Sequence, residues 1–130
     1  MTRRKNIQTL AAIGAAGAAV PAAAAGSAIQ LHVDLEVNPA KEADLAATYQ
    51  KVFQPAIRKQ PGFVDVKLLK FREAKSGKGP GVFRYRLLIS FQTEDQRVKW
   101  VASAEHQKVW PQMEACLTGT KYTATLYDLV

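Results

Sequence analysis

The chain has few of the residues that build metal centres and covalent catalysts. Its 130 residues include one cysteine, Cys116, and two histidines, His32 and His106, which lie far apart in the sequence. A single cysteine excludes a disulfide within the chain, and such a lone thiol is usually a small core residue. The histidines, the cysteine and the carboxylates are not spaced in the sequence like the ligands of a metal site. The sequence also has no motif typical of a nucleophile elbow. The Gly-rich segment 73–81 does not lead into a helix, which excludes a phosphate-binding loop of that kind.

Long runs of one charge are also absent. The 18 Lys and Arg residues exceed the 11 Asp and Glu residues, which gives a formal net charge of +7. Residues 1–28 hold three of the basic residues and no acidic one, which leaves 15 basic against 11 acidic residues and a net charge of +4 for residues 29–130. The basic residues are scattered among acids, whereas nucleic-acid-binding proteins cluster them on one face. We therefore expect no nucleic-acid partner.

Residues 1–28 are typical of a cleavable export signal. Basic residues at positions 3–5 precede an alanine-rich stretch, and Ala-x-Ala cleavage sites lie near Ala23–Ala25, with a further site after Ala28. Pro21 interrupts the stretch, and alanine is too weakly apolar to anchor the chain in a membrane. We expect a mature domain of residues 29–130, with the membrane as a partner only during export.

The export route has two candidates. The pair Arg3-Arg4 resembles a bacterial twin-arginine signal, which also favours Ala- and Gly-rich cores. Asn6 stands where that pattern has a large apolar residue, so the general secretory route is the alternative. Either route predicts a periplasmic or secreted protein.

Alternation and helical spacing divide the mature chain into strands and helices. Residues 29–37 alternate between apolar and polar side chains, which predicts a strand. Asn38-Pro39 supplies an N-cap and a proline at the first helical position, which predicts a helix over residues 40–59 with a bend at Pro55. The other expected elements are strands at 63–72 and 82–92, a helix from Thr93 to about Leu117, and a strand at 121–130.

The second helix opens with a capping box at Thr93, and Pro111 is expected to kink or break it. On this helix His106 lies near the edge of the apolar stripe, close to Trp110, and is either a pocket base or a core-edge residue. Trp100 falls on the far side, where we expect it to be exposed or to contact a partner. The residues of the expected apolar stripe are Val98, Val101, Ala102, Val109 and Met113.

The order β-α-β-β-α-β predicts an α+β fold of the ferredoxin-like split β-α-β type. With right-handed crossovers, the strands form a four-stranded antiparallel sheet of order 4-1-3-2 with both helices on one face. Val64, Val66, Leu68 and Leu88 are expected on the other face, where such aliphatic side chains need cover. A homodimer would supply that cover.

Short motifs are spread over nearly the whole mature chain: Gln60-Pro61-Gly62-Phe63, Trp100-x-x-Ser103-x-x-His106-x-x-x-Trp110, and Leu126-Tyr127. In this order they resemble the antibiotic-biosynthesis-monooxygenase family of dimeric α/β barrels. The resemblance implies two sheets packed face to face, with a cavity on the sheet face away from the helices. The implied activities are oxygenation of quinol-like aromatics without metal or flavin, haem breakdown, or no catalysis. The haem-degrading branch has an Asn on the first strand and a His where this chain has Trp110, which argues against haem chemistry.

Alternation places charged side chains of neighbouring strands on the face away from the helices. These are His32, Asp34 and Glu36 on the first strand, and Arg84, Arg86 and Ser90 on the third. In one interpretation Arg84 or Arg86 stabilises a phenolate or oxyanion while His32 transfers a proton. The ligand pocket would then include Asp34, Ser90, His106 and Trp110. In the other interpretation the charges form cross-strand ion pairs that fix the register and the dimer contact.

Two functions follow as hypotheses. The first is an exported, homodimeric, cofactor-independent monooxygenase-like protein that acts on a small aromatic or quinol substrate. The alternative is a non-catalytic dimeric α/β barrel that binds a small hydrophobic ligand. Neither hypothesis calls for a metal or another cofactor.

Overall fold

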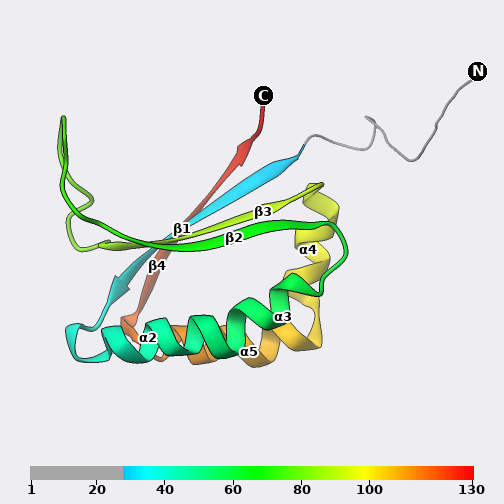
Figure 1. Cartoon of the computed structure of the whole chain (residues 1–130), viewed down its shortest axis with the longest axis horizontal. Helices are drawn as coiled ribbons and strands as arrows, with labels where there is room; N and C mark the ends of the chain where they lie inside the picture. Colours follow the sequence, from blue (N-terminus) through cyan, green and yellow to red (C-terminus); the bar gives the residue numbers. More distant parts are fainter. Residues whose placement is uncertain (1–27) are drawn as a thin grey trace, which may run out of the picture.

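The computed structural model describes residues 28–130, in which one antiparallel sheet carries helices on a single face (Figure 1). The strand order β2-β3-β1-β4 is the predicted order read from the other edge, so the ferredoxin-like fold is confirmed. The export signal at residues 1–28 lies, except for Ala28, outside the described residues. The strands are β1 (Ile29–Val37), β2 (Phe63–Lys70), β3 (Tyr85–Phe91) and β4 (Leu117–Asp128).

The central strand β1 pairs with β3 on one side and β4 on the other, both antiparallel. Its apolar residues Ile29, Val33 and Leu35 are buried on the side of the helices, as the alternation predicts. Opposite residues of a ladder share a face, so the pairs Asp34↔Arg86 and Val33↔Leu87 extend this division to β3. The sheet thus has a helix-covered face and an outer face.

Residues 39–58 form one continuous helical stretch of changing geometry. The 3₁₀ turn η1 (Pro39–Lys41) starts where Asn38 Oδ1 accepts a hydrogen bond from Ala40 N at 2.9 Å, as the N-cap prediction requires. A π-helical segment then precedes Pro55, which lies in the first turn of the last helix. The elements after η1 are α2 (Glu42–Thr48), η2 (Tyr49–Phe53) and α3 (Gln54–Arg58).

The second helical stretch breaks at Ser103 into α4 (Glu94–Ala102) and α5 (Ala104–Glu114). The helix does not break at Pro111, which lies inside α5. Ser103 has an extended backbone, and its Oγ accepts from His106 N at 3.1 Å and donates to the Trp100 carbonyl at 2.7 Å. One side chain therefore caps α5 and satisfies the end of α4.

This break corrects the expected helix faces. Trp100 is 2% exposed and belongs to the core, whereas Val98, which was expected in the apolar stripe, is 49% exposed. The prediction failed because it treated α4 and α5 as one continuous helix with a single apolar face. Only Val109 and Met113 of the expected stripe are fully buried.

A β-bulge corrects the expected faces of β2. Phe63 and Val66 pair with Phe91 and Ile89, which both point toward the helices, so the four residues 63–66 of β2 lie opposite the three residues 89–91 of β3. Val66 is therefore buried under the helices, and Leu68 also packs against the core instead of facing outward. The alternation rule was applied to an unbroken strand, which put both residues on the wrong face.

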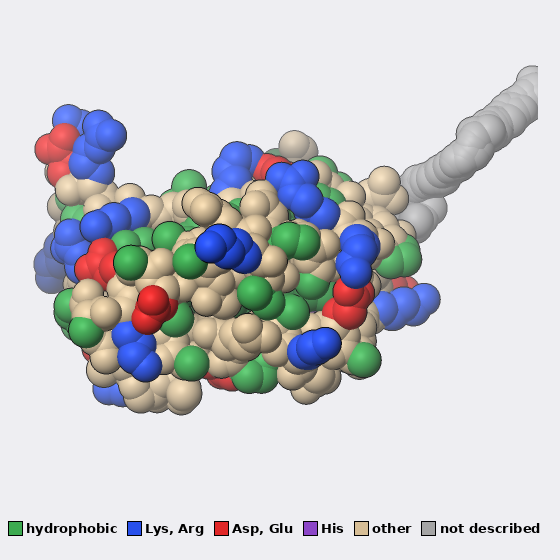
Figure 2. All heavy atoms as spheres, turned by 60° about the horizontal axis from the view of Figure 1, so that its bottom comes forward, with side chains coloured by type: hydrophobic (Ala, Val, Ile, Leu, Met, Phe, Trp, Pro, Cys, Tyr) green, Lys and Arg blue, Asp and Glu red, His purple; other side chains and the backbone are tan. Residues whose placement is uncertain are grey.

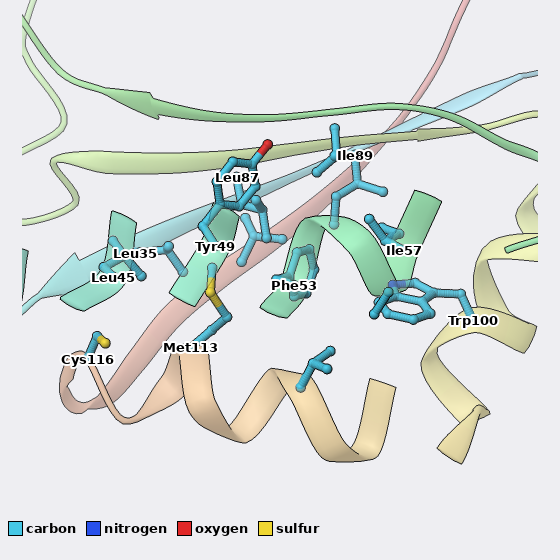
Figure 3. Close-up of a cluster of buried hydrophobic side chains, with 14 of the residues drawn as sticks. Leu35, Leu45, Tyr49, Phe53, Ile57, Leu87, Ile89, Trp100, Met113 and Cys116 are labelled. Carbon is cyan, nitrogen blue, oxygen red and sulfur yellow. The ribbon is translucent and has the colours of Figure 1, made fainter. Parts of the chain in front are cut away.

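The core fills the space between the sheet and the helices (Figure 3). Phe53 of η2 lies near its centre, with its ring 5.8 Å from that of Trp100 on α4. Cys116 is buried at the end of α5 and is a core residue, as expected. None of the described helices is long and apolar enough to cross a membrane.

Candidate active site

A cavity of about 210 Å³ lies between the sheet and the helices. This cavity is not the pocket predicted on the outer face, because it lies on the helix-covered side of the sheet. The aliphatic side chains of β1 and β3 form one wall, and the helices supply most of the aromatic and polar groups. The lining residues are Leu31, Val33, Phe53, Leu87, Ile89, Arg97, Trp100, Val101, His106, Trp110, Tyr122 and Ala124.

His106 is the group in this cavity that can exchange a proton near neutral pH. Its ring lies between two tryptophans, with centroids 5.0 Å from Trp100 and 6.2 Å from Trp110. Burial lowers the pKa of His106, and the positive charge of Arg97 lowers it further. Among the described residues, its buried Nδ1 has no hydrogen-bond partner. These surroundings favour the neutral form of the His106 imidazole.

Arg97 brings a fixed positive charge to the same cavity. Its Nε and Nη2 both donate to the Glu94 carboxylate at 2.7 Å, and its side chain is 18% exposed. This hydrogen-bonded pairing lowers the pKa of Glu94, which stays ionised and holds the guanidinium in place. Arg97 can thus stabilise a negative charge that develops in the cavity.

Aromatic rings surround the remaining space. Trp110 of α5 contacts Phe53 edge-on at 6.2 Å between ring centroids and Tyr122 of β4 at 5.3 Å. Tyr122 is 42% exposed, so its hydroxyl-bearing ring stands at the side of the cavity that solvent reaches. Such a lining suits a flat apolar molecule with few polar groups.

The predicted site residues of the outer face make hydrogen bonds with one another or with Gln30. Arg86 Nε donates to Asp34 Oδ1 at 2.7 Å, and Gln30 Nε2 donates to Ser90 Oγ at 3.3 Å. The His32 ring nitrogen Nε2 is 2.8 Å from Gln30 Oε1. Partial burial lowers the pKa of His32, and the positive charge of Arg86 adds to this effect. These contacts match the interpretation of cross-strand pairing that fixes the register.

The structure thus divides the predicted site residues into separate groups. His106 and Trp110 line the cavity, whereas His32, Asp34, Arg86 and Ser90 lie on the outer face. Arg84 lines a cleft on the outer side of the sheet together with Asp34 and Arg86, and its guanidinium lies 5.4 Å from the centre of the Phe71 ring.

Sequence reasoning missed the other cavity residues that carry polar or aromatic groups. Arg97 and Trp100 are three residues apart on α4, and this spacing could have placed them on one face. The signal was hidden because Val98 and Val101 suggested a different stripe. Tyr122 alternates with Ala124 on β4, and both face the helices opposite Leu35 and Val33.

Comparisons with solved structures find the same fold in the antibiotic biosynthesis monooxygenase type of ferredoxin-like protein. A protein of this type from Bordetella bronchiseptica is 20% identical with a TM-score of 0.65, over 81% of this chain and 99% of that chain. A mutant form of SnoaB, a cofactor-independent oxygenase from Streptomyces nogalater, is 17% identical with a TM-score of 0.62, over 80% of this chain and 94% of that chain.

A dimeric ferredoxin-like protein of unknown function from Jannaschia sp. CCS1 has a TM-score of 0.68 at 12% identity, over 79% of this chain and all of that chain. No family model matches the chain, and no curated protein matches it. Identities this low establish a shared fold, while the activity has to be argued from the site.

Proposed function

We propose that the protein is a cofactor-independent monooxygenase that oxidises a small phenol or quinol in the cavity between the sheet and the helices. The observation that carries this proposal is the half-buried imidazole of His106, which contacts Trp100 and Trp110 in a cavity that Arg97 also lines. The shared fold with the oxygenase SnoaB supports the reaction class. The cavity of about 210 Å³ favours a small substrate, because pockets for drug-sized ligands have volumes of about 300 Å³ or more.

The first chemical step is a proton transfer. The hydroxyl group of the substrate gives its proton to the His106 ring, which is neutral and can accept it. The resulting phenolate is stabilised by the positive charge of Arg97. The electron-rich ring then reacts with O₂ at a ring carbon. One oxygen atom becomes a carbonyl oxygen of the quinone product, and the other leaves as water with the proton held by His106 and the hydrogen lost from that ring carbon. The substrate supplies the electrons, and the balance needs no further reductant.

The experiment measures oxygen uptake with a panel of quinols and phenols on variants from the two sheet faces. Removing the base with His106→Leu should lower turnover by about 10²–10⁴-fold. The matched control, Arg86→Met, removes a charge from the outer face and should leave turnover unchanged. A loss of turnover in Arg86→Met with normal turnover in His106→Leu would contradict the proposal.

The binding-only alternative keeps the same cavity but has no turnover. If the parent consumes no oxygen with any member of the panel and the same compounds raise its melting temperature, that alternative is supported. A compound at about a hundred times its Kd adds about 2.7 kcal/mol to the stability of the folded state. Loss of this shift on replacing Trp110 by Ala would locate the ligand in the cavity.

We further propose that two copies associate through their outer sheet faces. On the outer face, the side chains of Leu69 and Tyr127 are 41% and 52% exposed. A second copy packed on this face would cover them. Strand β4 lies at the sheet edge and is exposed along nearly its whole length. The fold shared with the dimeric Jannaschia protein supports this assembly. Light scattering should give twice the monomer mass, and a stable monomer at micromolar concentration would contradict it.

We also infer that residues 1–28 direct export of the protein to the periplasm or the medium. The support is the sequence itself, with basic residues before an alanine-rich stretch and a cleavage site. Intact-mass analysis of the protein from its native cell should show a mature N-terminus between about Gly26 and Ile29. A cytoplasmic protein that keeps Met1 would contradict this inference.

A further inference from the structure

The net positive charge of the domain comes from one hairpin. Residues 67–86, which join and flank the ends of β2 and β3, contain seven Lys and Arg residues and one acidic residue, Glu73. The rest of the segment 29–130 contains eight basic and ten acidic residues, so its net charge is negative. The hairpin rises on the side of the sheet opposite the helices, and basic side chains gather at this end of the molecule (Figures 1 and 2).

A cleft of about 450 Å³ lies between this hairpin and the outer face of the sheet. It is separate from the cavity under the helices and shares no lining residue with it. Leu69, Phe71 and Phe83 supply apolar surface, and the basic residues that line the cleft are Lys70, Lys78, Arg84 and Arg86. The cleft thus combines aromatic and aliphatic surface with several positive charges.

The hairpin loop packs on its own aromatic ring. A Cβ added at Gly79 would lie 3.2 Å from Phe71 Cζ, so the loop backbone approaches the ring closely at this position. The Arg84 guanidinium lies 5.4 Å from the centre of the same ring. Phe71 N donates to the Arg84 carbonyl at 2.7 Å, which continues the hairpin beyond the two strands. These contacts hold Arg84 at the cleft.

Ion pairing divides the basic residues of the cleft into two kinds. Arg86 is paired with Asp34 at 2.7 Å, and Lys70 is paired with Glu42 at 3.0 Å. Arg84 and Lys78 have no carboxylate within 4.0 Å among residues 28–130. Two unpaired cations beside aromatic side chains are a suitable environment for an anion that carries an apolar group.

We propose that this cleft binds an aromatic organic anion, with a phosphate or carboxylate group on Arg84 and Lys78 and its ring on Phe71 and Phe83. The bidentate guanidinium of Arg84 suits either anionic group. The apolar side chains of the cleft would make an aromatic anion bind more tightly than a free inorganic anion. The site does not depend on the proposed oxygenase activity, because it lies on the opposite side of the sheet.

The experiment titrates the purified protein with phenyl phosphate and follows binding by calorimetry. Inorganic phosphate and benzyl alcohol test the anion and the ring separately, and both should bind more weakly. Arg84→Met should weaken phenyl phosphate binding at least about tenfold, as expected for the loss of a charged hydrogen-bonding partner. Arg72→Met is the matched control, because it removes the same charge from the same hairpin at a residue that does not line the cleft.

Equal weakening in the Arg84 and Arg72 variants would show that only the overall charge matters, and would overturn the proposal. Equal affinity for phenyl phosphate and inorganic phosphate would show that the aromatic side chains of the cleft do not bind the ring, and would overturn the proposal. Vesicles of anionic phosphatidylglycerol test the other source of a phosphate group. Binding to vesicles without binding to phenyl phosphate would assign the hairpin to a membrane surface and contradict the proposal. Light scattering confirms that the variants keep the assembly of the parent.

Discussion

Replacement of Gly62 by Ala tests how the start of β2 is fitted to α4, the helix that carries Arg97 and Trp100. Gly62 has a φ of +80°, and its carbonyl accepts a hydrogen bond from Gln92 N at 2.8 Å. A Cβ at this position would lie 1.9 Å from Gln96 Oε1 and 2.1 Å from Gln96 Cδ. The Gln96 side chain must therefore move if position 62 carries a methyl group.

The loss of folding stability expected for Gly62→Ala has two parts. A left-handed backbone costs an alanine about 1–2 kcal/mol. The second part is the displacement of Gln96, whose blocking atoms are the flexible end of the side chain, so that an altered rotamer at about 0.5–1.5 kcal/mol suffices. Gly81 has a φ of +66° with no atom within 4 Å of an added Cβ, so Gly81→Ala carries only the first part. The cost of Gly62→Ala should exceed that of Gly81→Ala by the second part.

The assay is urea unfolding of Gly62→Ala and Gly81→Ala, each alone and combined with Gln96→Ala, followed by the fluorescence of Trp100 and Trp110. In the Gln96→Ala background the excess cost at position 62 should disappear, while the cost at position 81 should stay the same. The N-cap hydrogen bond at Thr93 uses the backbone N of Gln96 and survives the substitution. Equal costs at both glycines in the parent background would refute this reasoning.

Other predictions concern ionisation, ion pairing and capping. Burial lowers the pKa of His106 in the folded state, so its contribution to stability is complete above the unfolded pKa of about 6.5 and declines as the pH falls below it. His106→Leu should therefore lose less stability than the parent between pH 7 and pH 5 in urea unfolding, and a parallel decline would contradict the assignment. Arg86→Met should change the free energy of unfolding by about 1 kcal/mol or less, because its pair with Asp34 is partly exposed, and a larger loss would show a stronger role. Ser103→Ala should lower it by about 1 kcal/mol through the lost cap, with Ser103→Asn as the control that keeps a capping oxygen.

The sheet and its order were predictable because they depend on strong, short-range patterns. Alternation over residues 29–37 gives the buried face of β1, and the register Asp34↔Arg86 confirms the expected meeting of acidic and basic residues. The chirality of the crossovers then restricts the strand order. Strand ends were less accurate, since the strand predicted at 82–92 spans Tyr85–Phe91 and that predicted at 121–130 spans Leu117–Asp128.

The β-bulge in β2 and the helix break at Ser103 were not predictable from such patterns, because each changes which residues face the core. The bulge between Phe63 and Asp65 moves Val66 and Leu68 to the helix side, and no glycine or proline between those two positions marks it. The break at Ser103 is also weakly marked, because His106 and not Glu or Gln stands three residues after it. Such shifts arise from tertiary packing and change which residues share a face.

The break at Ser103 is also what makes the candidate site. In one straight α-helix, Arg97 and His106 would point about 180° apart, because nine residues at about 100° each bring the second to the opposite side. Both line the same cavity in the structure, and the charge of Arg97 lowers the pKa of His106. Residues from α4 and α5 converge only because Ser103 ends one helix and starts the next in a new direction. A substitution that fused the two helices would therefore separate the base from the cation even with every cavity residue unchanged.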